Sequence, residues 1–281
     1  MKLLFIGAHQ DDCEICFGGL ALKAARMGHE VRFLSLTNGG GGHHLLSPEE
    51  TIATRAKESA AVAAYMGIRY DVWDIPDANL VPDLAARKRL IRYIRNFAPD
   101  LIMTHRPNDY HPDHRATGQL VMDASYLLIV PNECPDTPAL RRTPVIAYGE
   151  DNFRNPPFRA DLLVDISDVI EDKYKITALN ESQVYEWLPY ADCEEVPADP
   201  STWFDWLIGQ KVTEATTDEE VLAAPRGYGP FYAKTAARFR QELIAKYGPE
   251  RGAQIRFAEA YEICEYSGAM TEPVRTLLGS L

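Results

Sequence analysis

The N-terminal stretch of the chain sets the strongest limit on its fold. Residues 3–6 are all large and apolar, and this run ends at Gly7. The polar side chains that follow directly are His9, Asp11 and Asp12. A short apolar run that ends in glycine is typical of a buried strand in a parallel sheet. Because residues 14–26 then have apolar side chains at helical spacing, the polar cluster lies in a strand-to-helix turn, where open α/β sheets build their sites.

Strand and helix patterns alternate along the first half of the chain. Strands are predicted at residues 2–8, 31–36, 70–74, 100–104, 144–148 and 160–166, and helices at residues 14–26, 47–66, 82–97 and 115–128. Strict alternation gives right-handed crossovers and therefore a Rossmann-like α/β fold, with a mostly parallel sheet flanked by helices. The common strand order of such a sheet is 3-2-1-4-5. Ser47 and Glu50 have the spacing of a capping box at the start of the second helix.

The pattern changes after about residue 167. Helical stretches are predicted at residues 169–183, 200–212 and 232–247, and the sequence contains no internal repeat and no low-complexity linker. We therefore expect residues 1–185 to form a Rossmann-like core that carries the site. Residues 186–281 are expected to form a mostly helical C-terminal extension packed on that core.

A second polar cluster, at residues 105–114, follows the fourth predicted strand. It ends in His111-Pro112-Asp113-His114 and runs directly into a helix. In a sheet of order 3-2-1-4-5, the first and fourth strands are neighbours at the point where the strand order reverses. The two polar clusters are therefore expected to meet in one crevice, although they lie far apart in the sequence.

The residue types in these clusters are those of a catalytic metal site. Two imidazoles and one carboxylate, with one position left to water, are a recurring zinc set. His9, Asp12 and His114 can supply these ligands. Bound zinc lowers the pKa of its water to about 7 and polarises a carbonyl group.

The remaining polar side chains fit the other roles of amide hydrolysis. Asp11 could accept the proton of the water as general base, and His111 could stabilise the oxyanion or protonate the departing amine. Asp113 could orient His111 or a metal ligand. The structural alternative is helix capping by Asp11 or Asp12, and by an aspartate in the second cluster. Capping explains one aspartate in each turn but not their joint occurrence with histidines.

Charge and composition exclude several classes of partner. The chain has 41 acidic and 29 basic residues and a formal net charge of −12, which disfavours nucleic acid. No apolar stretch is long enough for a membrane span, and the N-terminus lacks the pattern of a signal peptide. Five cysteines are too few for a disulfide scaffold, so reduced thiols in a cytoplasmic protein are expected. Whether the chain forms a homo-oligomer stays open.

The two clusters together resemble the motifs of the PIG-L/LmbE family of zinc-dependent deacetylases. The matching segments are Ala8-His9-Gln10-Asp11-Asp12 with Glu14 and Gly18-Gly19, and His111-Pro112-Asp113-His114. Further similar positions are Arg55 and Glu58, Asp77, Asp165-Ile166-Ser167, Lys175, Ser182-Gln183 and residues 256–261. Most of the first 185 residues are covered by this resemblance.

The resemblance implies a function and a residue-by-residue site. Members of the family hydrolyse N-acetyl groups, mostly from substrates that contain N-acetylglucosamine, on a Rossmann-like fold. The implied metal is zinc, with iron(II) as the alternative, and the substrate is a small amino sugar. The implied roles are metal ligand for His9, Asp12 and His114, base for Asp11, electrostatic partner for His111, and sugar contact for Arg55 and Asp77.

The chain also departs from the family pattern. Gln10 stands where proline is usual, the glycine loop at residues 39–42 lacks the usual acidic residue, and Asn180-Glu181 replaces a common histidine. These departures concern the substrate more than the reaction. Two alternatives follow: an amidase acting on a larger acyl group, such as a thiol-sugar or antibiotic conjugate, and a silent metal-dependent sugar-binding protein. The intact Asp11 and His111 count against the silent protein.

Other features have simpler interpretations. Cys13 and Cys16 have the spacing of a redox or zinc pair, but buried small side chains are expected. His43 and His44, which follow the glycines, are expected to be solvated. Three tryptophans in the C-terminal part are expected in the core rather than as a platform for sugar rings. These tryptophans are Trp187, Trp203 and Trp206.

Overall fold

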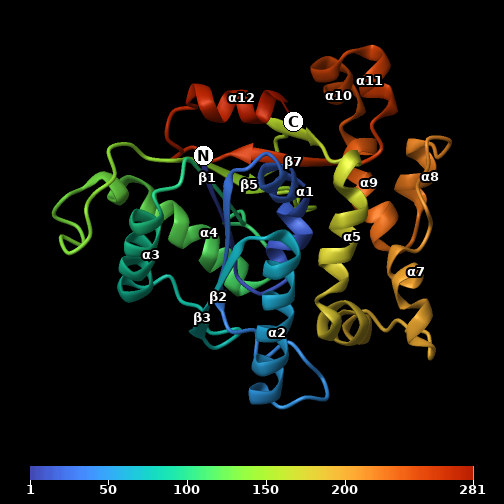
Figure 1. The fold of residues 1–281 in the computed structure, drawn as a ribbon, viewed down its shortest axis with the longest axis horizontal. Helices are drawn as coiled ribbons and strands as arrows, with labels where there is room; N and C mark the ends of the chain where they lie inside the picture. Colours follow the sequence, from blue (N-terminus) through green and yellow to red (C-terminus); the bar gives the residue numbers. More distant parts are fainter. Residues whose placement is uncertain (281) are drawn as a thin grey trace.

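A seven-stranded sheet forms the centre of the computed structural model, which describes residues 1–280 (Figure 1). The strands are β1 (Lys2–Gly7), β2 (Glu30–Thr37), β3 (Arg69–Ile75), β4 (Leu101–Thr104), β5 (Val145–Gly149), β6 (Leu162–Asp165) and β7 (Ala258–Ile263). Their order is β3-β2-β1-β4-β5-β7-β6. The first five strands are parallel and confirm the predicted order 3-2-1-4-5.

Helices cover both faces of the sheet. They are α1 (Asp12–Arg26), α2 (Pro48–Met66), α3 (Leu84–Phe97), α4 (Pro112–Ser125), α5 (Ile170–Ala178), α6 (Leu188–Ala191), α7 (Trp203–Ile208), α8 (Asp218–Ala223), α9 (Tyr228–Arg238), α10 (Arg240–Tyr247), α11 (Pro249–Gln254) and α12 (Glu272–Ser280). A π-helical segment, Ser182–Trp187, precedes α6. Within residues 1–280, no helix is both long and apolar enough to cross a membrane.

The central strand β1 is buried on both faces, as its continuous apolar run predicts. Leu3 and Phe5 pack into one core with side chains of α1, α2 and α5. Leu4 and Ile6 point the other way and pack with side chains of α3 and α4. Figure 1 shows α3 and α4 on one side of the sheet, and α7 to α9 outside α5 on the other side.

Local capping signals explain where two helices begin. The hydroxyl of Ser47 accepts from the backbone of Glu50, whose side chain in turn accepts from the backbone of Ser47, so the predicted capping box at α2 is confirmed. Helix α4 begins at Pro112, earlier than predicted, because the Nδ1 of His111 accepts from the backbone N–H of Asp113 and caps the helix. The metal-ligand candidate at the start of this helix therefore lies in its rigid first turn.

The C-terminal part contributes a strand that the sequence pattern did not predict. Strand β7 lies between β5 and β6 and is antiparallel to both. Its alternation of small and acidic residues, Ala-Glu-Ala-Tyr-Glu-Ile, lacks the apolar run that marked the other strands. The division of the chain at residue 185 stays a prediction, and β7 links the two parts by strand pairing.

A buried carboxylate on β7 fixes the position of α1. The two oxygens of Glu259 accept from the backbone N–H groups of Gly19 and Leu20, each at 2.7 Å, and also from Lys173 and Tyr261. A Cβ on Gly19 would lie 2.8 Å from the Glu259 carboxylate and 2.5 Å from a methyl group of Ile166. Gly19 therefore permits the close approach of α1 to β7, because only glycine leaves room for it.

Replacing Glu259 by alanine should strongly destabilise the fold. The change leaves the Lys173 ammonium group buried without its partner, which costs about 3–5 kcal/mol of the free energy of unfolding. Denaturant unfolding followed by circular dichroism measures the loss, and Glu265→Ala at an exposed position is the matched control. Equal, small losses in both variants would contradict the structural role of Glu259.

Candidate functional site

The turn after β1 holds Asp11 in a strained backbone conformation. Its φ angle is 105°, a region that non-glycine residues rarely adopt, and its side chain makes no capping hydrogen bond to α1. Helix capping therefore does not explain Asp11. Strain of this kind persists where the surrounding structure holds a side chain in place for function.

The side chain of the neighbouring Asp12 points back toward the end of β1. Its Oδ2 accepts from the backbone N–H groups of Ala8 and His9, each at 2.8 Å. A Cβ on Gly7 would lie only 2.7 Å from the Cβ of Asp12, so the glycine that ends β1 permits this fold-back. The Oδ1 of Asp12 is left to face His114 at 3.4 Å.

The three predicted metal ligands lie close together. His9 Nδ1 and His114 Nε2 are 3.2 Å apart, which is near the separation of about 3.3–3.4 Å that zinc requires between two ligands of a tetrahedron. Different oxygens of Asp12 face the two rings: Oδ1 lies 3.4 Å from His114 Nε2, and Oδ2 lies 3.7 Å from His9 Nδ1. The role of these three residues as ligands stays a prediction.

The opposite nitrogens of both histidines are held by carboxylates. His9 Nε2 lies 3.1 Å from Asp77 and 3.3 Å from Asp113, and His114 Nδ1 lies 3.0 Å from Asp109. Metal-ligating histidines almost always donate their second N–H to such a partner, which fixes the ring orientation. This arrangement is the strongest structural argument for a metal centre here.

His105 and Asp109 were not singled out from the sequence. His105 Nε2 lies 2.9 Å from Asp12 Oδ2, and its ring stacks on that of His114 at 4.1 Å. The position of His105 could have been inferred, because it directly follows β4 and Ile6 pairs with Thr104 in the sheet. Asp109 lies in an irregular loop, where sequence spacing gives no contact.

Other ligand combinations exist in the same cluster. Three trios place their ligand atoms within 4.8 Å of one another: His9 with His111 and His114, Asp12 with His105 and His114, and His9 with Asp77 and Asp113. All three include His9 or His114. The Asp113 carboxylate also accepts from the backbone N–H groups of Ala78 and Leu80, which leaves it less free to bind an ion.

Mutual charge pairing keeps His9 and Asp12 ionised despite their burial. Burial alone would lower the pKa of His9, but hydrogen bonds to Asp113 and Asp77 outweigh it and raise the pKa to about 10. Burial would likewise raise the pKa of Asp12, but the charges of His114 and His105 hold that pKa well below its usual value. A metal ion would therefore displace protons from imidazoles that are charged without it.

Arg55 contacts the Asp11 turn, and the structure places it too deep for easy contact with a sugar. It is 2% exposed, its Nη2 lies 3.4 Å from Asp11 Oδ1, and the same atom donates to the carbonyl of Gln10. Burial raises the pKa of Asp11, and the charge of Arg55 opposes this rise. Its predicted contact with sugar hydroxyls stays untested, and the observed contacts are those of a residue that positions Asp11.

His111 and Asp113 have distinct surroundings. Because His111 Nδ1 accepts from the backbone N–H of Asp113 at 3.2 Å, the neutral ring carries its proton on Nε2. Burial and the charges of His9 and His114 lower the pKa of His111, which favours this neutral form. Asp113 was predicted to orient either His111 or a metal ligand. Its carboxylate lies 3.3 Å from Nε2 of the ligand candidate His9.

The glycine loop after β2 packs against the site instead of extending into solvent. Gly41 donates to Asp77, and Gln183 donates to the carbonyl of Gly42. His43 has a side chain that is 1% exposed and lies 2.6 Å from the Glu186 carboxylate. The expectation that His43 is solvated is therefore wrong, because its ring joins this loop to the C-terminal part.

The cysteines and tryptophans mostly follow their simpler interpretations. Cys13 is a buried free thiol that contacts the carbonyl of Phe5, and Cys16 is also free. Trp203 stacks on Tyr185 and is partly buried in a small apolar cluster with Trp206.

Comparison with known proteins gives related sequences and folds. Residues 4–125 match the family described as PIG-L: GlcNAc-PI de-N-acetylase. Diacetylchitobiose deacetylase from Thermococcus kodakarensis is 31% identical over 205 residues, which cover 67% of this chain and 74% of that protein.

Two solved structures share the fold. One is N,N'-diacetylchitobiose deacetylase from Pyrococcus horikoshii in complex with its inhibitor MPG, with a TM-score of 0.68 at 23% identity. The match covers 94% of this chain and 84% of that chain. The 4-carboxy-2-hydroxymuconate hydratase GalB from Pseudomonas putida has a TM-score of 0.70 at 18% identity, with 96% of this chain and 98% of that chain covered. At these identities the likeness shows the fold alone.

The ligand assignment is tested by two histidine variants. His114→Ala should abolish stoichiometric zinc binding, because it removes one of three ligands, whereas His111→Ala should retain the metal. Metal analysis of the purified variants gives the answer directly. Loss of zinc from His111→Ala as well would favour the trio of His9, His111 and His114, and retention of zinc by His114→Ala would favour the trio of His9, Asp77 and Asp113.

The carboxylate behind His114 should tune metal affinity without binding the ion. Asp109→Asn is expected to weaken zinc binding about 10–100-fold, the usual effect of losing such a partner. Competition with a chromogenic chelator measures the affinity. Asp74→Asn, whose carboxylate pairs with Arg89 on the surface, is the matched control. Unchanged affinity in Asp109→Asn would refute this role.

Proposed function

The chain belongs to the PIG-L family, and from this premise we propose that it is a zinc-dependent hydrolase that removes an N-acetyl group from an amino sugar or its conjugate. The observation that carries the proposal is the convergence of His9, Asp12 and His114 with both histidines held by carboxylates. The relative from Thermococcus kodakarensis that is named as a deacetylase supports the same reaction.

The proposed metal would be held by His9, Asp12 and His114. When bound, it supplies a Lewis acid that polarises the acyl carbonyl and acidifies a water molecule. All other steps depend on side chains of the chain itself.

Asp11 is proposed to move the proton. It lies in the same turn as the ligands His9 and Asp12, and burial raises its pKa, as a general base near neutral pH requires. Asp11 accepts a proton from the attacking water and then delivers it to the amide nitrogen as the C–N bond breaks. The products are acetate and the free amine, so one water is consumed for each bond cleaved.

His111 is proposed to stabilise the charge that develops on the acyl oxygen. Its ring lies edge-on to His9 at 4.6 Å, and its Nε2 carries a proton in the neutral form described above. A fixed donor of this kind lowers the barrier most when it is aimed at the developing charge. Between the two roles predicted for His111, this geometry favours the oxyanion partner over the acid that protonates the amine.

Replacing the base should separate catalysis from metal binding. Asp11→Asn is expected to keep stoichiometric zinc but to lose about 10²–10⁴-fold in kcat, because general-base catalysis contributes about this much. Amine release from N-acetylglucosamine conjugates is the assay, together with metal analysis. Parent-like turnover by Asp11→Asn would show that another group accepts the proton.

Screening of the parent protein tests the reaction itself. The zinc-loaded protein is incubated with a panel of N-acetylated sugars, and both acetate and free amine are quantified. A hydratase on the same fold would release neither product, so this readout separates the two activities. Tight sugar binding without product under zinc or iron(II) would favour the non-catalytic alternative.

A further inference from the structure

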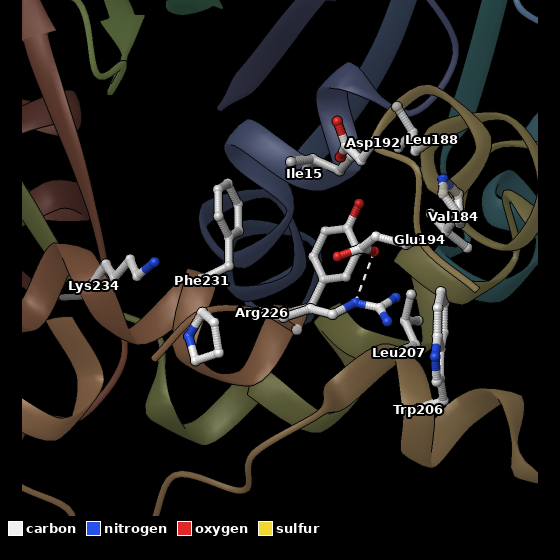
Figure 2. A pocket seen from close by; sticks show the side chains of 14 residues that line it. Ile15, Val184, Leu188, Asp192, Glu194, Trp206, Leu207, Arg226, Phe231 and Lys234 are labelled. Atoms are coloured by element: carbon white, nitrogen blue, oxygen red, sulfur yellow. Dashed lines mark ion pairs between the residues drawn. The ribbon is translucent and has the colours of Figure 1, made fainter. Parts of the chain in front are cut away.

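An apolar pocket lies beside the first turns of α1, between that helix and the C-terminal helices. Its volume is about 310 Å³. Its apolar lining includes Ile15, Val184, Leu188, Trp206, Tyr228 and Phe231. Four charged side chains, Asp192, Glu194, Arg226 and Lys234, also line it. Figure 2 shows Ile15 from α1 on the same pocket as Phe231 from α9 and Trp206 from α7. The residues of the histidine and aspartate cluster do not line it.

This pocket is one helical turn away from the proposed base. The backbone N–H of Ile15 donates to the carbonyl of Asp11 at 2.9 Å, so the two residues belong to the same turn of α1. Burial raises the pKa of Tyr228, and the charge of Asp11 raises it further. The charge of Asp11 is therefore felt at Tyr228 on the wall of the pocket.

The walls of the pocket suit an apolar group better than a second sugar ring. The Arg226 guanidinium lies over the ring of Trp206 at 3.7 Å and covers that aromatic face, which a sugar would otherwise use. Arg226 is itself held by Glu194 at 2.7 Å (Figure 2). Tyr228 packs against Phe231 edge-to-face at 5.7 Å. These contacts leave an apolar cavity without an open stacking platform.

One polar group of the pocket has no protein partner. Within residues 1–280, the Tyr228 hydroxyl forms no hydrogen bond to another residue, and it is not among the buried polar atoms that lack a partner, so solvent reaches it. A ligand with an oxygen next to its apolar part, as in a glycoside, would accept from this hydroxyl in place of water.

We propose that this pocket is a subsite for an apolar aglycone, so that the preferred substrate is an N-acetylated amino sugar linked to an alkyl or aryl group. The inference rests on the proposed function and specifies its substrate class. The relatives named deacetylases remove a two-carbon acyl group, which is far too small to fill this volume. The apolar group is therefore assigned to the other end of the substrate.

The parent protein provides the first test. The kcat/KM for the hexyl and phenyl glycosides of N-acetylglucosamine should exceed that for the methyl glycoside at least about tenfold, since even one methylene in a matched pocket gives such a ratio. Methyl glycosides that carry N-acetyl or N-hexanoyl groups form the second arm. Equal rates for all the aglycones, or a preference for the hexanoyl chain, would overturn the aglycone assignment.

Variants connect the preference to this pocket. Phe231→Ala removes a side chain that is 46% exposed, so the fold should tolerate the change. The ratio of kcat/KM for the hexyl glycoside to that for the methyl glycoside should fall at least about threefold. Trp187→Ala is the matched control, because Trp187 stacks on Tyr190 outside the pocket and should leave the ratio unchanged. A ratio that stays at the parent value in Phe231→Ala would refute the pocket as the site of the preference.

Direct binding separates the failure of this inference from the failure of the proposed function. Calorimetry with hexyl and methyl glucosaminide, the deacetylated products, needs no turnover. If no glycoside releases amine but the hexyl compound binds at least about tenfold more tightly, the subsite stands and the proposed reaction fails. Turnover with equal affinity for both compounds would leave the reaction intact and refute the subsite.

Discussion

The adjacency of β1 and β4 in the parallel sheet is the constraint on which the whole site depends. Ile6 pairs with Thr104, so both strands end at the same level and their following turns leave the sheet side by side. Each turn runs directly into a helix, α1 or α4, whose first residues are rigid. His9 and His114, 105 positions apart in the sequence, are thereby held with ring nitrogens 3.2 Å apart.

Burying these histidines side by side would cost free energy without the carboxylates that surround them. The carboxylates that contact the histidines are Asp12, Asp77, Asp109 and Asp113. Isolated carboxylates or imidazolium ions would be expensive to bury, but each of these groups has a partner of opposite charge within hydrogen-bond distance. The same pairing fixes the orientation of His9 and His114. A divalent cation can therefore replace protons in this cluster.

The sequence predicted the parts of this arrangement that follow from strand patterns. Apolar runs placed the strands, the common topology placed β1 beside β4, and the six residues at their ends were found together. No role was predicted for His105 and Asp109. The place of His105 follows from the end of β4, whereas the contact of Asp109 depends on the path of an irregular loop. The burial of Arg55 against Asp11 was not predicted, since helix spacing does not show how deep a side chain lies, and its predicted contact with a sugar stays a prediction. Strand β7 lacked an apolar run and pairs only with distant strands.

The C-terminal part of the chain contributes to the site through α1. The first turn of this helix carries Asp11, Ile15 one turn later lines the apolar pocket, and Gly19 is held by Glu259 of β7. A rigid helix transmits a displacement at one end to the other, because each residue adds a fixed rise of 1.5 Å. The buried pair of Glu259 and Lys173 therefore fixes α1 against β7 and α5, and with it the turn that carries the proposed base. The proposed chemistry of the N-terminal turns and the proposed selectivity of the C-terminal helices are joined by this one helix.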